Sequence, residues 1–177
     1  MKRTKLASFF VAAVLAAPAP CADEIPPSTA SPRLESQIRR ELARLPFYGV
    51  FDLLQYRVEG DAVVLAGQVT RPTLKDDAER LVRNIEGVSE VINQIEVLPL
   101  SPMDDRIRLA AFKAIYIHSL LNRYALDPMP PIRIVVRDGA IALEGEVLNE
   151  AERDVAFLAA QSVPGVFQVT NNLRVAR

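Results

Sequence analysis

The sequence repeats itself after 78 residues, and this repeat limits what the chain can fold into more than any other feature. Twelve of the forty residues from 58 to 97 are identical to the residue 78 positions later, with no gap. The clearest recurrences are those of Gly67-Gln-Val69 as Gly145-Glu-Val147 and of Gly87-Val88 as Gly165-Val166. Self-similarity at a fixed spacing indicates that one supersecondary unit occurs twice. We therefore predict two tandem modules, residues 33–98 and 102–176, joined by the short Pro99-Leu-Ser-Pro102.

Hydrophobic periodicity predicts the same order of elements in both modules. In the first module, Leu34, Ile38 and Leu42 share one helical face, and residues 54–58 then alternate as a strand. The alternation continues beyond Gly60-Asp61, which predicts a hairpin, and a second helix and a last strand follow. In the second module the turn is Asp138-Gly139, a pair that favours positive φ. The prediction is an α+β chain of two tandem αββαβ modules, each a three-stranded mixed sheet with two helices on one face.

Glycines and asparagines that recur in both modules are predicted to have structural roles. Gly67 and Gly145 allow a helix to pack closely on a strand, whereas Gly87 and Gly165 fit the left-handed position that ends a helix. Two asparagines, Asn93 and Asn171, lie on the same strand faces as apolar residues. A buried amide must find hydrogen-bond partners, so we expect both to bond to the backbone of a neighbouring loop or helix end.

The N-terminal 22 residues are predicted to form a secretory signal peptide. Lys2, Arg3 and Lys5 precede the apolar run 6–17, which is too short for a transmembrane helix of ~20 residues. Residues 23–32 are predicted to be a flexible leader, because their prolines and small polar residues show no periodicity. Cys21 leaves two alternatives open: it leaves with the signal peptide, or it is lipidated and anchors the protein. We expect an exported protein with no transmembrane helix in the mature chain.

The residue counts exclude several classes of chemistry. The chain has one cysteine and one histidine, which cannot supply the four ligands of a structural zinc site. Nucleophilic catalysis with a histidine base would depend on His118 alone. Without the signal peptide the net charge is about minus four, whereas proteins that neutralise nucleic-acid phosphates are usually basic. We expect no enzyme activity, no cofactor or metal ion, and no nucleic-acid partner.

The element order, together with a glycine in the second hairpin strand and a Gly-Val pair before a VxNxIxV strand, resembles the BON domain. The residues that carry the resemblance are Leu65, Gly67, Val69, Gly87, Val88, Val91, Asn93, Ile95 and Val97, with Leu143, Gly145, Val147, Gly165, Val166, Val169, Asn171, Leu173 and Val175 in the second copy. The resemblance implies a non-enzymatic module of the bacterial envelope that associates with phospholipid membranes or with other proteins, and we expect this protein in the periplasm. In a lipoprotein member of the family, the first helix of the second module contacts anionic lipid.

The corresponding helix of this chain, predicted at residues 104–124, has more apolar surface than one core contact needs. Leu109, Phe112, Tyr116 and Leu120 are predicted to face the core, and a second apolar stripe with basic flanks adjoins them. That composition is typical of a helix at an anionic lipid surface. The predicted lipid or partner surface comprises Arg106, Arg108, Lys113, Ile115, Ile117 and Leu121.

Burial between the modules is the alternative interpretation of this second stripe. The open sheet face of the first module offers Val64, Ala66 and Ile92 as a partner surface. Exposure of Ile115, Ile117 and Leu121 would indicate a membrane or partner surface, whereas burial against module one would leave a scaffold.

The predicted function is therefore contact with anionic phospholipid or with an envelope protein, by an exported and non-enzymatic protein. Two alternatives stay open. One is a periplasmic stress-response protein that binds unfolded clients like a chaperone, and the other is an interaction module of a larger secreted assembly.

Overall fold

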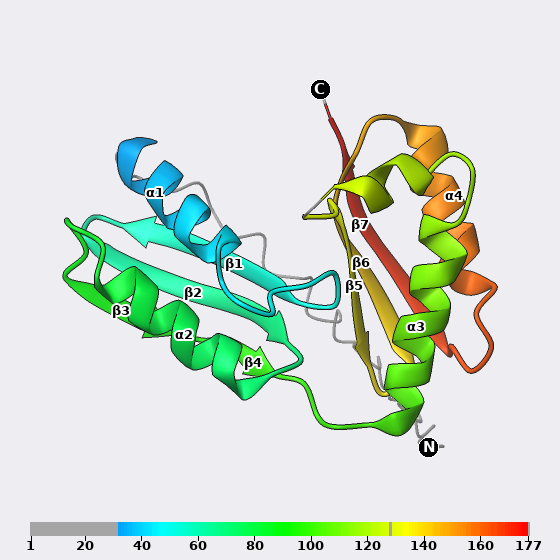
Figure 1. Cartoon of the computed structure of the whole chain (residues 1–177), viewed down its shortest axis with the longest axis horizontal. Coiled ribbons are helices and arrows are strands. Elements are labelled where there is room, and N and C mark those ends of the chain that lie inside the picture. The colour runs from blue at the N-terminus through cyan, green and yellow to red at the C-terminus, as the bar shows by residue number, and fades with distance from the viewer. Residues whose placement is uncertain (1–31, 128, 177) are drawn as a thin grey trace, which may run out of the picture.

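The computed structural model describes residues 32–127 and 129–176, which form two α+β modules in tandem (Figure 1). The predicted signal peptide, Cys21 and residues 23–31 of the predicted leader lie outside the described residues. Module one contains α1 (Pro32–Ala43), β1 (Leu53–Glu59), β2 (Ala62–Val69), α2 (Pro72–Arg83), β3 (Glu90–Asn93) and β4 (Glu96–Val97). Module two contains α3 (Pro102–Tyr116), the 3₁₀-helix η1 (Asn122–Leu126), β5 (Ile132–Arg137), β6 (Ala140–Val147), α4 (Glu150–Gln161) and β7 (Gln168–Val175).

Both sheets are mixed, as predicted. In module one β1 and β2 form an antiparallel hairpin, and β3 and β4 together form an interrupted third strand parallel to β2. In module two β5 and β6 are antiparallel, while β7 runs parallel to β6 without interruption. Asp138 and Gly139 form the second hairpin turn with φ values of 50° and 77°, the positive values predicted for this pair.

Each sheet has its two helices on one face, and each module has its own core (Figure 1). In module one the predicted helical face of α1 is buried through Ile38 and Leu42, and α2 contributes Leu74, Ala78 and Val82 to the same core. The core of module two is formed by Ile107, Ala111, Ile115, Tyr116, Leu121, Ile132, Ile134, Val136, Ile141, Leu143, Val147, Ala156, Ala160, Val163 and Leu173. The predicted fold class is confirmed.

Positions 67 and 145 require glycine because the backbone of the partner strand lies close to them, and not because a helix packs there. Their φ values are 119° and 117°. A Cβ atom on Gly67 would lie 2.1 Å from the carbonyl oxygen of Leu53, and one on Gly145 would lie 1.8 Å from that of Pro131. Leu53 begins β1 and Pro131 immediately precedes β5, so the close approach is to the partner strand of the hairpin and the prediction of close helix packing was wrong.

Gly87 and Gly165 occupy turns that follow the helices, and neither is the residue that ends a helix. Helix α2 already ends at Arg83, and the turn closes where the amide of Val88 donates to the carbonyl of Ile85 (3.2 Å). Gly87 is the third residue of this turn, with a φ of 92° that favours glycine. The equivalent turn after α4 has Gly165 in the same position. Both glycines lie two residues beyond the predicted C′ position, so that prediction was wrong.

Asn93 and Asn171 connect the last strand of each module to a helix, as predicted. The side-chain amide of Asn93 donates to the carbonyl of Lys75 (3.0 Å), and that of Asn171 donates to the carbonyl of Arg153 (3.1 Å). The side-chain oxygens accept from the amides two residues later. Lys75 and Arg153 are also 78 residues apart, so the repeat preserves these backbone hydrogen bonds, whereas the additional bond from Asn93 to the Glu79 carboxylate (3.0 Å) occurs in module one.

We predict that Asn171→Leu lowers the free energy of unfolding of module two by about 1–3 kcal/mol, because the carbonyl of Arg153 and the amide of Leu173 lose their partner. Thermal and urea unfolding measure this loss. Asn172→Leu is the matched control, because Asn172 is exposed on the neighbouring position of β7. An unchanged melting temperature for Asn171→Leu would contradict the assigned role.

Candidate functional site

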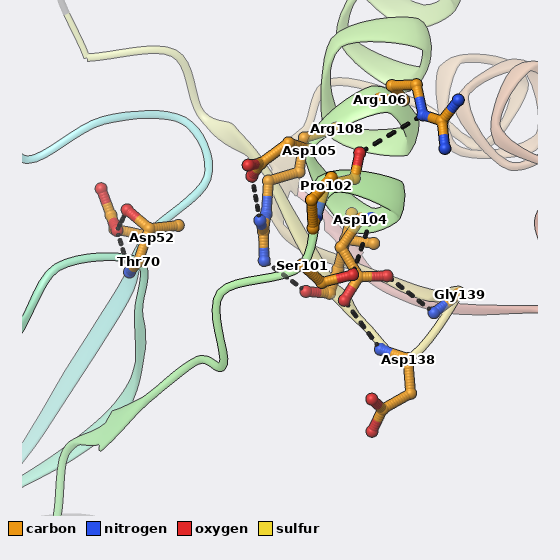
Figure 2. Close-up of polar contacts among 11 residues, drawn as sticks. Asp52, Thr70, Ser101, Pro102, Asp104, Asp105, Arg106, Arg108, Asp138 and Gly139 are labelled. Carbon is orange, nitrogen blue, oxygen red and sulfur yellow. Dashed lines mark hydrogen bonds and ion pairs between the residues drawn. The ribbon is translucent and has the colours of Figure 1, made fainter.

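Contacts of Ser101 and Asp104 anchor the first turn of helix α3, as Figure 2 shows. The hydroxyl of Ser101 caps the helix by accepting from the amide of Asp104 (3.2 Å). The buried carboxylate of Asp104 accepts from the backbone amides of Asp138 (3.1 Å) and Gly139 (2.9 Å). The beginning of α3 is thereby fixed to the turn between β5 and β6.

Arg108 is held against the sheet rather than exposed. Its guanidinium pairs with Asp105 (2.6 Å) and donates to the carbonyl of Val136 on β5 (2.8 Å). Only 7% of the side chain is exposed. Arg108 therefore does not belong to a free surface, which corrects the sequence-based prediction.

The contacts of Asp104 and Arg108 set the rotation of α3, and this rotation differs from the predicted one. The core face of the helix contains Ile107, Ala111 and Ile115. Leu109, which was predicted to face the core, is 57% exposed. Since Asp104 and Arg108 point inward, the apolar residues on the opposite side must point to solvent.

Two further residues of the predicted surface are buried. Ile115 and Leu121 are fully inside the core of module two. The helix also ends at Tyr116, eight residues before the predicted end, because the chain turns at His118, whose carbonyl accepts from the amides of Leu121 and Asn122 (2.9 Å each). This turn returns Leu121 to the core and exposes Leu120, which was predicted to be buried.

The remaining predicted surface residues, Arg106, Lys113 and Ile117, are exposed together. At 100° per residue they lie within about 80° of one another and of Leu109. Ile117 is 73% exposed, and Leu120 follows in the next turn. We call Arg106, Leu109, Lys113, Ile117 and Leu120 the α3 ridge. Sequence reasoning missed Leu109 and Leu120, although the spacing of Arg106 and Lys113 by seven residues marked this side of the helix as exposed.

The opposite flank of α3 contacts module one through a loop, residues 47–52, which we call the junction loop. Phe51 packs edge-on against Phe112 of α3, with ring centroids 6.2 Å apart. Val50 and Phe51 also pack against the core of module two. An inter-module contact for the extra apolar surface was predicted, but it involves this loop and not a sheet face with Val64, Ala66 and Ile92.

Polar contacts hold the junction loop along β5, the edge strand toward which it extends in Figure 1. The amide of Ile134 donates to the carbonyl of Val50 (2.9 Å). The guanidinium of Arg133 donates to the carbonyl of Gly49 (2.8 Å) and lies 4.6 Å above the ring of Tyr48. These contacts cover part of the β5 edge, which would otherwise present unpaired backbone groups.

The shape of the junction loop is fixed from inside module one by Asp52. Its carboxylate is buried and accepts from the amide of Gly49 (3.0 Å), and from both the amide (2.7 Å) and the hydroxyl (2.8 Å) of Thr70. The pair of Asp52 and Thr70 is drawn in Figure 2. A buried carboxylate with several donors makes the loop a rigid extension of module one.

Burial raises the pKa of two tyrosines beside this junction. Loss of hydration raises the pKa of Tyr116, whose hydroxyl donates to the carbonyl of Ile132. Loss of hydration also raises the pKa of Tyr48, against the opposing effect of the Arg133 guanidinium. In both cases the folded protein favours the neutral phenol.

Other kinds of site find no support in the described residues. Across residues 32–127 and 129–176, every helix is too short or too polar to span a bilayer. Within the same ranges, no three Asp, Glu, His or Cys side chains gather in a way that would hold a metal ion.

The first prediction from this site is that Phe51→Ala, a change in module one, destabilises module two by about 2 kcal/mol, because its core loses a half-buried aromatic ring. Hydrogen exchange of β5 and α3 amides, with chemical denaturation, measures the effect. Phe47→Ala is the control in the same loop, since Phe47 is 70% exposed. Unchanged exchange in module two would contradict the packing role of Phe51.

The second prediction concerns alkaline pH. A tyrosine with a raised pKa contributes stability below the unfolded pKa of about 10, and this contribution is lost as pH rises beyond it. The free energy of unfolding should therefore fall above pH ~10, and Tyr116→Phe should show a smaller fall than the wild type. Urea unfolding across this pH range is the measurement, and equal slopes for the two proteins would contradict it.

Comparison with known protein families finds the same family in both halves of the chain. The model of the BON domain matches residues 31–99 and 117–177. Comparison with curated proteins gave no match. Two solved structures of CdsD, a structural protein of the type III secretion system of Chlamydia trachomatis, are similar to this chain at 11% and 14% identity.

The first CdsD structure, its C-terminal domain, aligns over 84% of this chain and all of that domain with a TM-score of 0.30. The second aligns over 82% of this chain and 94% of that solved chain with a TM-score of 0.29. BON domains are non-catalytic modules, and tandem copies typically occur in non-enzymatic envelope proteins. With two matches that together span most of its length, the chain belongs to the BON-domain family.

Proposed function

We propose that the protein is exported and binds anionic phospholipid surfaces in the cell envelope through the α3 ridge. The observation that carries the proposal is the joint exposure of Ile117, Leu120 and Leu109 beside Arg106 and Lys113. Apolar side chains enter the headgroup region of a bilayer, and neighbouring cations attract anionic lipids.

The cations of the α3 ridge are available for such a contact. The acidic residues in the first turn of α3 are Asp104 and Asp105, and these are engaged with the β5–β6 turn and with Arg108. Within the described residues, neither Arg106 nor Lys113 takes part in an ion pair, and the Nε of Arg106 donates to the carbonyl of Pro102 (3.3 Å). The positive charge on the ridge is therefore not neutralised locally.

The junction supports this role by holding α3 in place. One side of the helix is fixed by Phe51 and by the core, so the ridge is presented on a rigid element. A rigid helix loses little conformational freedom on binding, which favours association. The basic start and apolar run of the first 22 residues support the proposed export, and tandem BON domains typically occur in envelope proteins.

Co-sedimentation with vesicles tests the proposal. We expect the protein to bind vesicles that contain phosphatidylglycerol and to bind pure phosphatidylcholine vesicles less. Ile117→Ser should weaken binding about tenfold, because burial of one large aliphatic side chain is lost. Leu158→Ser on α4 is the matched control, since Leu158 is 61% exposed but lies outside the α3 ridge.

Three results would contradict the proposal. The first would be a wild-type protein that remains in the supernatant with both kinds of vesicle. The second would be a loss of binding in Leu158→Ser as large as that in Ile117→Ser. The third is suppression of client aggregation without vesicle binding, which would favour the chaperone-like alternative.

A further inference from the structure

Helix α1 occupies the same place in module one as α3 does in module two, but its outer surface has a different composition. Arg33, Arg40 and Arg44 lie within about 40° of one another on a helical projection, on the side opposite to Ile38 and Leu42. All three are exposed, and Arg44 is the first residue after the helix. We call these three residues the arginine stripe.

Most other arginines on the outer helix surfaces have acidic partners, whereas the arginine stripe is largely unpaired. Arg80 pairs with Asp77 (2.6 Å) and Arg83 with Glu79 on α2, and Arg153 pairs with Glu150 (2.6 Å) on α4. In the stripe, Arg44 makes a longer contact to Glu41 (3.6 Å). Among the described residues, no acidic group forms an ion pair with Arg33 or Arg40. The stripe is therefore a local excess of positive charge in a chain whose net charge is −1.

We propose that the arginine stripe is a second contact with the membrane, one that binds the phosphates of anionic phospholipid headgroups. This inference rests on the proposed function, since it concerns the same membrane, but it involves the other module and another kind of interaction. Guanidinium groups bind phosphate oxygens through paired hydrogen bonds. The stripe extends about 16 Å along the helix, so its charges reach several headgroups and not one small ligand.

The residues between these arginines indicate that the contact stays at the headgroup level. Ser36, Gln37 and Ala43 separate or flank the stripe, and none of them is a large apolar side chain that enters the bilayer. The contribution of α1 should therefore be electrostatic and sensitive to salt, whereas that of the α3 ridge includes burial of apolar surface.

The test compares two triple variants of the whole protein. One is Arg33→Gln with Arg40→Gln and Arg44→Gln, and the control is Arg80→Gln with Arg83→Gln and Arg153→Gln. Both remove three positive charges from helix surfaces, and glutamine has nearly the same helix propensity as arginine. Circular dichroism verifies that both variants are folded before binding is measured.

We expect the stripe variant to bind phosphatidylglycerol vesicles about tenfold to a hundredfold more weakly than the wild type at low salt. The difference should shrink as salt is raised, and the control should keep most of its affinity. Wild-type affinity in the stripe variant would overturn the inference, and so would an equal loss in the control. Equally tight binding of the wild type to heparin would also overturn it, because the stripe would then recognise polyanions in general.

The two proposals fail in different ways. If the stripe variant binds normally while Ile117→Ser loses affinity, the arginine stripe has no role and the α3 ridge keeps its role. If the wild type binds no vesicle, both proposals are wrong.

Discussion

Val50 and Phe51 belong to module one by sequence, yet they pack on the core of module two. The packing of Phe51 on Phe112, the bond from Ile134 to the carbonyl of Val50, and the position of Arg133 all depend on the shape of the junction loop. That shape depends in turn on the buried carboxylate of Asp52. A single loop, held from one module and inserted against the other, thus joins the two similar units and covers one flank of α3.

Much of the scaffold was predictable because it is specified locally. The repeat, the hairpin turn at Asp138-Gly139 and the partners expected for Asn93 and Asn171 follow from spacing and residue type alone. The rotation of α3 was not predictable in this way. It is decided by the inward contacts of Asp104 and Arg108 with β5 and its turn, and a helical projection treats charged residues of this kind as exposed. The family itself was recognisable, since its pattern depends on the repeated scaffold.

The junction escaped prediction for a related reason. The junction loop precedes the segment in which the two copies are similar, and it has no helical or strand periodicity. Its partners, Arg133 and Ile134, are more than eighty residues away along the chain. Duplication therefore left the two cores alike, while the surfaces of α1 and α3 and the contacts between the modules diverged. The features that distinguish the two copies are the ones on which the proposed functions depend.

The contact between the modules has a direction, because a loop of one copy meets the edge strand of the next. Such a head-to-tail contact has no internal symmetry, and in principle it can be repeated by adding further copies to form an open chain. At the 78-residue offset of the repeat, module two has Pro128, Met129 and Pro130 in place of Val50, Phe51 and Asp52. Proline has no amide hydrogen and a fixed φ, so it is a poor substitute where a segment must lie along a strand. The second copy therefore does not repeat the Phe51 ring or the Asp52 carboxylate on which the junction loop of module one depends.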